Sequence, residues 1–416
     1  MRECAIYVRA VTGLARLLVG AALLTAGSES VYAQSPQFDP SGLDAEKYGA
    51  AQGFPIGGPY TYAKPPFVIG SYSHFDSIFP ARGVPHPTTV WNFQRAAAEP
   101  EIRYQWDGKT QSLDDYLAHI HVTGLLIGKG DTIFVERYRY GRTDRDRFAS
   151  ASMVKTLNAM LLGIALQDGR IQSIDDKAQR YVPTLGSSPY GVSTLRNLLH
   201  MASGVASNDR PLLTGLYTLS KNDDAAVLAS FRGHAAPAGS VFNYACGDSQ
   251  TLGMVVRSAV GKPLATYMSE KIWQPIGAEQ DASWTIVGSG QEFACFGFNA
   301  ILRDWGRIGR LLAHDGNWNG RQLIPKQWLI DATTVPKGIA QPPTTVKNVL
   351  GYGYQVWIIP GDRRMFALVG AEGQFILVDP ASKLFMVQTA VGVDPAGIQG
   401  AETISLWRAL VQSLGQ

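Results

Sequence analysis

The sequence predicts an α+β fold, in which both ends of the chain build one antiparallel sheet and a helical lobe is inserted between them. Apolar, β-branched segments around the turn Lys129-Gly130-Asp131 predict a β-hairpin, and similar segments near the C-terminus predict further strands. The stretch from about 175 to 335 instead shows helical patterns broken by turns. The predicted strands are 124–127, 132–138, 354–359, 365–369, 374–378 and 384–389.

Helices are expected to flank this sheet. The clearest one covers residues 152–167, where Met153, Leu157 and Ile164 recur at helical spacing and define a buried face. It begins shortly after the predicted hairpin. Other segments with helical patterns are 112–120, 194–200, 264–272, 301–314 and 402–414.

The composition is that of an ordinary globular protein. Of the 416 residues, 45% are hydrophobic and only 17% are charged, which excludes an intrinsically disordered chain. A net charge of +3 is too small to favour nucleic-acid binding. After the N-terminal region no run of ~18 apolar residues occurs, so no membrane span is expected there.

The first 33 residues have the layout of a secretory signal peptide. Three arginines precede or open the apolar run 17–26, and Val31-Tyr32-Ala33 supplies small residues for cleavage after Ala33. The alternative, an uncleaved anchor helix, ranks lower because the apolar run is short for a membrane span. The mature protein is therefore expected to be periplasmic or secreted.

The rest of the chain divides into an arm and a folded domain. Residues 34–110 are rich in Pro, Gly and aromatic residues and show no helical period, as in Gly57-Gly58-Pro59. This predicts an extended arm that wraps on the body or is partly disordered. Residues 111–416 are expected to form the folded domain, with its helical lobe at about 175–335.

The motif Ser152-Met153-Val154-Lys155 opens the first long predicted helix. Its spacing places the Ser152 hydroxyl and the Lys155 amine on one helical face. A serine hydroxyl needs a base to remove its proton, and a lysine serves as that base when burial lowers its pKa. About one Ser-x-x-Lys is expected by chance in a chain of this length, so its place at a strand-to-helix junction gives the motif its weight.

Four further landmarks follow this motif in order. They are 194–204, 239–244 with Asp248-x-Gln250, 299–312, and 351–354 with 370–374 ahead of Asp379-Pro380. Together with Ser152-x-x-Lys155, this order resembles serine hydrolases of the class C β-lactamase/DD-peptidase superfamily. Within it, the chain looks most like the 6-aminohexanoate-oligomer hydrolases and related esterases. The resemblance covers roughly residues 110–415 and implies a β-lactamase/transpeptidase-like fold.

The resemblance also implies that Tyr244 is a third catalytic residue. A phenol beside Lys155 can relay a proton between the serine hydroxyl and a leaving group. The alternative, a core tyrosine in the helical lobe, is the default for any lone Tyr. The neighbouring Phe242-Asn243 and Asp248-x-Gln250 favour the catalytic role.

Two departures from the resembled family bear on the substrate. Its β-lactamases and DD-peptidases carry Asn two residues after the Tyr, where this chain has Cys246. Their closing strand carries a cation in a Lys-Thr-Gly or His-x-Gly triplet, whereas the matching triplet here is Leu368-Val369-Gly370. Arg363 and Arg364 are nearby but are expected in an exposed turn. A pocket without that cation disfavours acidic β-lactams and leaves ester or linear-amide hydrolysis.

An oxyanion hole is expected from the backbone N–H of Ser152 and a second N–H of the closing strand, for which Ala371 is the nearest candidate. Glu372 either meets a substrate amine or is a solvated turn carboxylate.

Three functions are therefore compatible with the sequence. The leading prediction is a serine hydrolase that cleaves a small-molecule ester or linear amide through a Ser152 acyl-enzyme. The first alternative is a β-lactamase or DD-peptidase, which turnover of nitrocefin or of a D-Ala-D-Ala peptide would support. The second is a non-catalytic binding or sensor protein on the same fold, although such a relative usually lacks one of Ser152, Lys155 and Tyr244.

The remaining reactive residues suggest no cofactor. The seven His are scattered, and His119-x-His121 has no third ligand at metal spacing. No phosphate-binding Gly loop is present, so neither a metal nor a nucleotide is expected. Cys246 and Cys295 remain after signal cleavage, and either a disulfide or two buried thiols fits the sequence. The oligomeric state does not follow from the sequence.

Overall fold

The computed structural model describes residues 34–206, 223–342 and 351–415. The predicted signal peptide, residues 1–33, and its cleavage point after Ala33 lie outside the described residues. Within these ranges, no helix combines the length and apolar character that crossing a bilayer requires.

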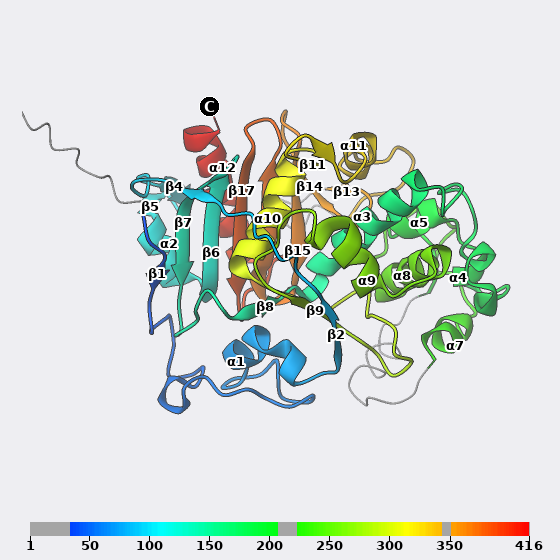
Figure 1. Ribbon diagram of the computed structural model, residues 1–416, viewed down its shortest axis with the longest axis horizontal. Helices are drawn as coiled ribbons and strands as arrows, with labels where there is room; N and C mark the ends of the chain where they lie inside the picture. Colours follow the sequence, from blue (N-terminus) through cyan, green and yellow to red (C-terminus); the bar gives the residue numbers. More distant parts are fainter. Residues whose placement is uncertain (1–33, 207–222, 343–350, 416) are drawn as a thin grey trace, which may run out of the picture. The chain divides into compact units, whose positions relative to one another are not determined.

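Among the described residues, a nine-stranded sheet joins the two ends of the chain, as the sequence predicted (Figure 1). Its strand order is β1-β7-β6-β17-β16-β15-β14-β13, and β3 also pairs with β7. The pairs are antiparallel, except that β1 and β3 run parallel to β7. The strands are β1 (Gln37–Phe38), β3 (Gln94–Arg95), β6 (Val122–Lys129), β7 (Thr132–Tyr138), β13 (Gly351–Tyr352), β14 (Trp357–Ile359), β15 (Met365–Gly370), β16 (Gln374–Asp379) and β17 (Leu384–Ala390).

Each face of this sheet has its own core, because successive side chains of a strand point to opposite faces. On β6, Leu125 and Ile127 pack in the core that includes α2 (Leu113–His119) and α12 (Ile398–Leu414). Leu126 packs in the other core, together with α3 (Val154–Gln167) and α10 (Leu302–Ala313). The sheet is therefore buried on both faces, and α3 approaches it from the side of α10.

The predicted helical lobe follows α3 in the chain. It contains α4 (Pro189–Val192), α5 (Leu195–Leu199), α7 (Asp224–Ala229), α8 (Cys246–Val260), α9 (Leu264–Met268) and α11 (Lys326–Ala332). A second, four-stranded sheet, which the sequence did not predict, has the order β2-β9-β10-β8. Its strands are β2 (Ala81–Val84), β8 (Arg147–Ala149), β9 (Ala282–Thr285) and β10 (Phe298–Ile301). This sheet connects the arm, the segment before α3 and the lobe.

The N-terminal arm takes part in both sheets through β1, β2 and β3. It also contains a six-residue helix, α1 (Val68–Ser73), which no periodic pattern predicted. An aromatic cluster buries this part of the arm: Phe75 lies 4.8 Å from Phe79 and 5.2 Å from Phe296 between ring centroids. The described arm thus contributes side chains to the core of the folded domain.

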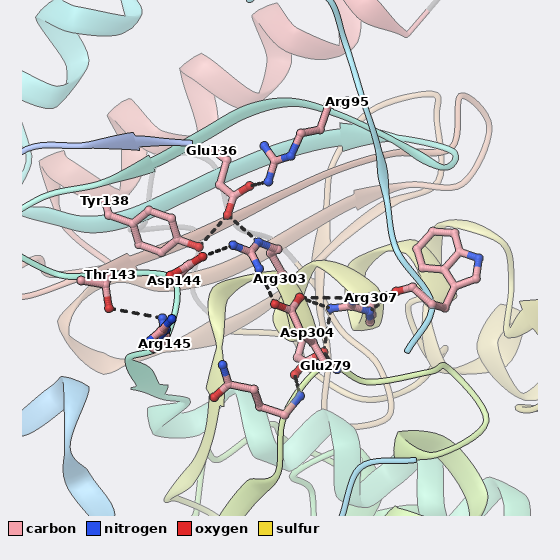
Figure 2. Close-up of polar contacts among 12 residues, drawn as sticks. Arg95, Glu136, Tyr138, Thr143, Asp144, Arg145, Glu279, Arg303, Asp304 and Arg307 are labelled. Carbon is pink, nitrogen blue, oxygen red and sulfur yellow. Dashed lines mark hydrogen bonds and ion pairs between the residues drawn. The ribbon is translucent and has the colours of Figure 1, made fainter. Parts of the chain in front are cut away.

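A group of charges around the buried Glu136 links the arm to α10 (Figure 2). Glu136 of β7 is only 2% exposed, and its carboxylate pairs with Arg95 of the arm and with Arg303 of α10. The Arg303 Nε donates to Glu136 Oε1 at 2.8 Å, while its other nitrogens pair with Asp144 and Glu279. One guanidinium therefore serves three carboxylates from three separate segments.

The next turn of α10 extends this network. Arg307 donates to Asp304 Oδ1 at 2.8 Å and to the Trp91 carbonyl at 2.6 Å. Burial raises the pKa of Asp304 to about 6, although Arg307 and two backbone N–H groups act to lower it. The Arg303-Asp304 landmark thus has a structural role, which is to join the arm, β7 and α10.

Candidate active site

Ser152 lies in a tight turn between β8 and α3, on the 3₁₀ segment Ala151–Met153. The turn begins with Ala151 at a positive φ of 43°, a strained conformation for a residue other than glycine. It is held from outside by β10: the Ser150 N–H donates to the Phe298 carbonyl at 2.7 Å, and the Phe298 N–H donates to Ser150 Oγ at 3.0 Å. These bonds fix the backbone that presents the partly exposed Ser152.

Lys155 lies one turn further along, and the structure confirms that it meets Ser152. Its Nζ is 2.9 Å from Ser152 Oγ and donates a second hydrogen bond to the Cys295 carbonyl at 2.8 Å. The Lys155 residue is only 3% exposed. The amine is therefore oriented by two oxygens inside the protein, one of which belongs to the expected nucleophile.

Tyr244 lies just before α8, with its ring against the same amine. Lys155 Nζ is 4.9 Å from the centroid of the Tyr244 ring. The neighbouring backbone is held by Met201: the Asn243 N–H donates to its carbonyl at 2.7 Å, and the Ala245 N–H donates to its Sδ at 3.4 Å. The structure thus brings Ser152, Lys155 and Tyr244 together, as the sequence predicted.

Cys246 and Cys295 form a disulfide, with their Cα atoms 5.4 Å apart. This decides between the two states that the sequence left open. Cys246 is the first residue of α8 and follows Tyr244 by two positions. Cys295 supplies the carbonyl that binds Lys155 Nζ. The bridge therefore joins two segments that both contact the lysine.

Aromatic side chains surround Tyr244. Trp357 of β14 stacks on Tyr244 with ring centroids 5.8 Å apart, and Tyr352 of β13 contacts both Trp357 and Phe242 at 4.9 Å. Phe242, Tyr244 and Trp357 are partly exposed, whereas Tyr352 is buried. These rings form an apolar wall beside the Ser152–Lys155 pair.

The closing strand β15 ends against the serine turn. A Cβ placed on Gly370 would lie 2.5 Å from the Ser150 carbonyl oxygen and 2.9 Å from Ala151 Cβ. Such a close approach leaves room for glycine alone. The backbone that follows Gly370 therefore lies next to the turn that carries Ser152.

Comparison with known proteins agrees with this arrangement of Ser152, Lys155 and Tyr244. A family model described as Beta-lactamase matches residues 111–403. The chain belongs to the beta-lactamase family. A 6-aminohexanoate-dimer hydrolase of Paenarthrobacter ureafaciens is 25% identical over 343 residues, which cover 75% of this chain and 85% of the relative. A protein of Escherichia coli K12, provisionally named a D-alanyl-D-alanine carboxypeptidase, is 29% identical over 122 residues, or 27% of this chain and 28% of its own.

Solved structures show the same fold. One from Bacillus anthracis, provisionally named a 6-aminohexanoate-dimer hydrolase, superposes with a TM-score of 0.74 over 86% of this chain and 97% of its own, at 23% identity. A structure from Bacteroides dorei, provisionally named a beta-lactamase, gives a TM-score of 0.60 at 17% identity, over 73% of this chain and 97% of its own. At these identities the likeness concerns the fold, which is the β-lactamase/transpeptidase-like one that the sequence predicted.

Within this beta-lactamase fold, residues of the sequence landmarks form hydrogen bonds that hold the helices carrying the site residues in place. Asp248 of α8 is fully buried and accepts a hydrogen bond from Ser203 Oγ at 2.7 Å, which joins two of the landmarks. Gln355 accepts from Ser249 Oγ at 2.6 Å, and its carbonyl accepts from Thr156 Oγ1 at 2.6 Å. These bonds fix α8 to α3, and so Tyr244 to the helix of Lys155.

His200, in the landmark 194–204, has a packing role as well. Its ring lies edge-on to Tyr354 with centroids 4.9 Å apart. Burial lowers the pKa of His200 to about 4, with a further lowering from Arg196. The imidazole is therefore neutral around pH 7 and supports the 352–354 segment.

The side chains in and around the closing strand β15 show where the nearby cations and the neighbouring carboxylate of Glu372 are bound. Strand β15, Met365–Gly370, carries no Lys or Arg. Arg363 instead binds Asp379 at 2.6 Å, and Arg364 binds Asp315 and Thr333. Glu372 accepts a hydrogen bond from the Gly392 N–H at 2.6 Å, which supports its interpretation as a turn carboxylate.

The histidine pair of the sequence is split between two carboxylates. His119 Nδ1 lies 3.3 Å from Glu402, and His121 Nε2 lies 3.2 Å from Asp44. In the part of the chain that the structure describes, no three His, Cys, Asp or Glu side chains gather in a group that could hold a metal ion.

Sequence reasoning missed three contributors to the site. The Cys295 carbonyl is a backbone group and leaves no signal in a motif. The strained Ala151 also has no signature, because alanine is not typical of positive φ. The wall formed with Tyr352 and Trp357 was within reach, since both lie in the 351–359 segment that the family landmark opens.

The contact between Gly370 and the serine turn yields a prediction. In Gly370→Ala the new Cβ meets backbone that is itself pinned by β10, so the strand end must shift by several tenths of an ångström. We expect Ser152 to react with a serine-directed probe at least ~10-fold more slowly, since small misplacements of reacting groups are costly. The measurement is the rate of labelling by a serine-directed fluorophosphonate. Gly83→Ala, also in a strand but with nothing within 4 Å of the new Cβ, is the control and should label at the wild-type rate.

Proposed function

We propose that this beta-lactamase-family protein is a serine hydrolase that cleaves a small-molecule ester or linear amide bond through a Ser152 acyl-enzyme. The observation that carries the proposal is the position of Lys155 Nζ, 2.9 Å from Ser152 Oγ and against the Tyr244 ring. A nucleophile within hydrogen-bond reach of its base, with the base oriented by a further group, is the arrangement that covalent catalysis requires.

The steps follow from this arrangement. Neutral Lys155, assisted by Tyr244, accepts the Ser152 proton as Oγ attacks the substrate carbonyl. The backbone N–H of Ser152 and an N–H of the segment after Gly370 stabilise the tetrahedral oxyanion. The Lys155–Tyr244 pair then protonates the leaving alcohol or amine, and a water molecule repeats the sequence to release the acid.

The aromatic wall and the uncharged strand β15 favour a substrate without a carboxylate next to the scissile bond. The aromatic rings offer hydrophobic contact to an alkyl or aryl chain, but they cannot form an ion pair with a carboxylate. Arg363 and Arg364, the nearest cations in sequence, are bound to Asp379 and Asp315. A linear amide or ester fits this wall better than a β-lactam, and the name of the Paenarthrobacter relative points to the same class of bond.

We further propose that the protein works in the periplasm or outside the cell. The predicted signal peptide supports this location, and so does the Cys246–Cys295 disulfide, because disulfides persist in oxidising compartments.

The proposal is tested by treating the mature protein with a fluorophosphonate and measuring its intact mass. We expect one adduct that maps to Ser152 and is absent from Ser152→Ala. The same preparations are then assayed with p-nitrophenyl esters and a linear 6-aminohexanoate dimer. Ser187→Ala, an exposed serine in the lobe, is the matched control and should label like the wild type.

The other outcomes separate the alternatives. Turnover of nitrocefin or of a D-Ala-D-Ala peptide above that of esters and linear amides would establish a penicillin-recognising enzyme instead. Folded protein that forms no adduct and hydrolyses none of these substrates would indicate a binding or sensor protein.

A further inference from the structure

We propose that the Cys246–Cys295 disulfide positions Lys155 for catalysis, an inference that rests on the proposed serine-hydrolase function. The bridge begins two residues after Tyr244 and ends at the residue whose carbonyl accepts a hydrogen bond from Lys155 Nζ at 2.8 Å. It therefore links covalently the tyrosine segment and the acceptor of the lysine.

Helix α8, which begins at Cys246, forms hydrogen bonds with the 292–295 segment and packs against it. Gln250, one turn along α8, accepts from the Ala294 N–H at 2.8 Å and donates to the Glu292 carbonyl at 3.2 Å. A Cβ on Gly253 would lie 2.4 Å from Ala294 Cβ, so the helix packs against this segment almost at backbone distance. Cys246, Gln250 and Gly253 thus form one contact surface toward the 292–295 segment.

The start of the same segment is fixed by charge. Glu292 is 1% exposed, and its carboxylate binds Arg82 of β2 and Arg257 of α8. The bonds to Glu292 and Ala294 restrain the chain up to the residue before Cys295. The disulfide then restrains Cys295 itself, whose peptide group must point its oxygen at Lys155.

The consequence concerns the direction of one carbonyl. The N–H of the same peptide, on Phe296, donates to the Phe293 carbonyl at 3.2 Å. Without the bridge this bond still limits the peptide, but the Cys295 side chain is no longer fixed to α8, so the carbonyl can turn away from Lys155 while Gln250 still holds Ala294. A displacement of about 1 Å in a reacting group can cost up to ~10²-fold in rate. The aromatic wall of Phe242, Tyr352 and Trp357 is not part of the 292–295 segment, so substrate binding should change little.

The experiment compares the oxidised wild type with Cys246→Ala/Cys295→Ala and Cys246→Ser/Cys295→Ser. For each we measure kcat and KM on a p-nitrophenyl ester and the rate of fluorophosphonate labelling at Ser152. We expect kcat and the labelling rate to fall roughly 10- to 100-fold, with KM within about threefold of the wild type. Leu410→Ala, a buried residue of α12, lowers stability elsewhere and should leave the labelling rate unchanged.

The outcomes separate this inference from the function on which it rests. Absence of labelling in the oxidised wild type contradicts the serine-hydrolase function itself. Wild-type labelling that persists at the same rate in a folded variant without the bridge overturns only the positioning role.

If neither pair of substitutions folds, the oxidised wild type is treated with a phosphine reductant. Its labelling rate is then followed against the appearance of two thiols by mass. Loss of labelling while the circular dichroism is retained supports positioning, whereas simultaneous loss of both signals shows a purely structural bridge.

Discussion

Replacing Lys155 with methionine should lower kcat/KM for ester hydrolysis by about 10² to 10⁴-fold, the range that a positioned acid–base group contributes. We expect the upper part of this range, because in the proposed mechanism both the attack of Ser152 and the protonation of the leaving group pass through the Lys155 amine. Methionine is an unbranched side chain only one atom shorter than lysine and suits a site that is 3% exposed, so the fold should persist. The measurement is steady-state kinetics, supported by circular dichroism of the variant.

Lys155→Arg separates proton transfer from charge. A guanidinium keeps the positive charge and can still donate to the Cys295 carbonyl, but it does not lose a proton in proteins. We therefore expect Lys155→Arg to be nearly as inactive as Lys155→Met. Activity above a tenth of the wild type in the arginine variant would mean that Lys155 acts by charge and that another group is the base. Lys109→Met, at an exposed position that begins the strand Lys109–Ser112 at the end of the arm, should remain fully active.

The residues predicted to carry the chemistry were accessible from sequence because each lies inside a short motif at a defined place. Ser152 lies on the 3₁₀ segment that leads directly into α3, which carries Lys155, so their closeness follows from local helical geometry. Tyr244 is distant in sequence and could be joined to them only through the family resemblance. The Cys295 carbonyl could not be found in this way, since a backbone oxygen that completes a site is set by tertiary packing.

The fold was predictable where apolar residues follow a regular period, as in α3 and the hairpin of β6 and β7. Helix α8 shows why the rest was not: its residues from Cys246 to Val256 are all buried, and they include the polar Asp248, Ser249 and Gln250. A helix that is buried all round, with polar residues among the buried ones, has no apolar face for a period to mark. Strands of three or four residues, such as β8 and β9, are too short to show alternation.

A single polar residue explains another difference. The predicted strand 354–359 pairs only over Trp357–Ile359. Gln355 adopts a φ of 57° and turns its amide into the lobe, where its Nε2 donates to the Leu198 carbonyl at 2.8 Å. At Gln355 the backbone therefore departs from strand pairing, and the Gln355 side chain connects the segment before β14 to α5 and α8.

Replacing Arg303 with methionine should destabilise the protein by about 3–5 kcal/mol, the usual cost of removing one partner from a buried ion pair. The variant leaves Glu136, whose side chain is 1% exposed, with Arg95 as its remaining cation; it also removes the pairs of Arg303 with Asp144 and with Glu279, of which Glu279 keeps Arg307 at 3.4 Å (Figure 2). Urea unfolding at pH 7 gives the loss directly. Because the network lies between the arm, β7 and α10, we expect the loss in stability without a change in Ser152 labelling at low temperature.

Two further variants test the cause. In Arg303→Met/Glu136→Gln the buried carboxylate is neutralised, so part of the lost stability should return, and the double-mutant cycle should give a coupling energy of opposite sign to the single losses. Arg103→Met removes an exposed arginine that binds Glu101 at 2.8 Å, and such a surface pair is worth about 0–1 kcal/mol. Equal losses for Arg303→Met and Arg103→Met would contradict the argument, because the burial of Glu136, a partner of Arg303, is what distinguishes the two sites.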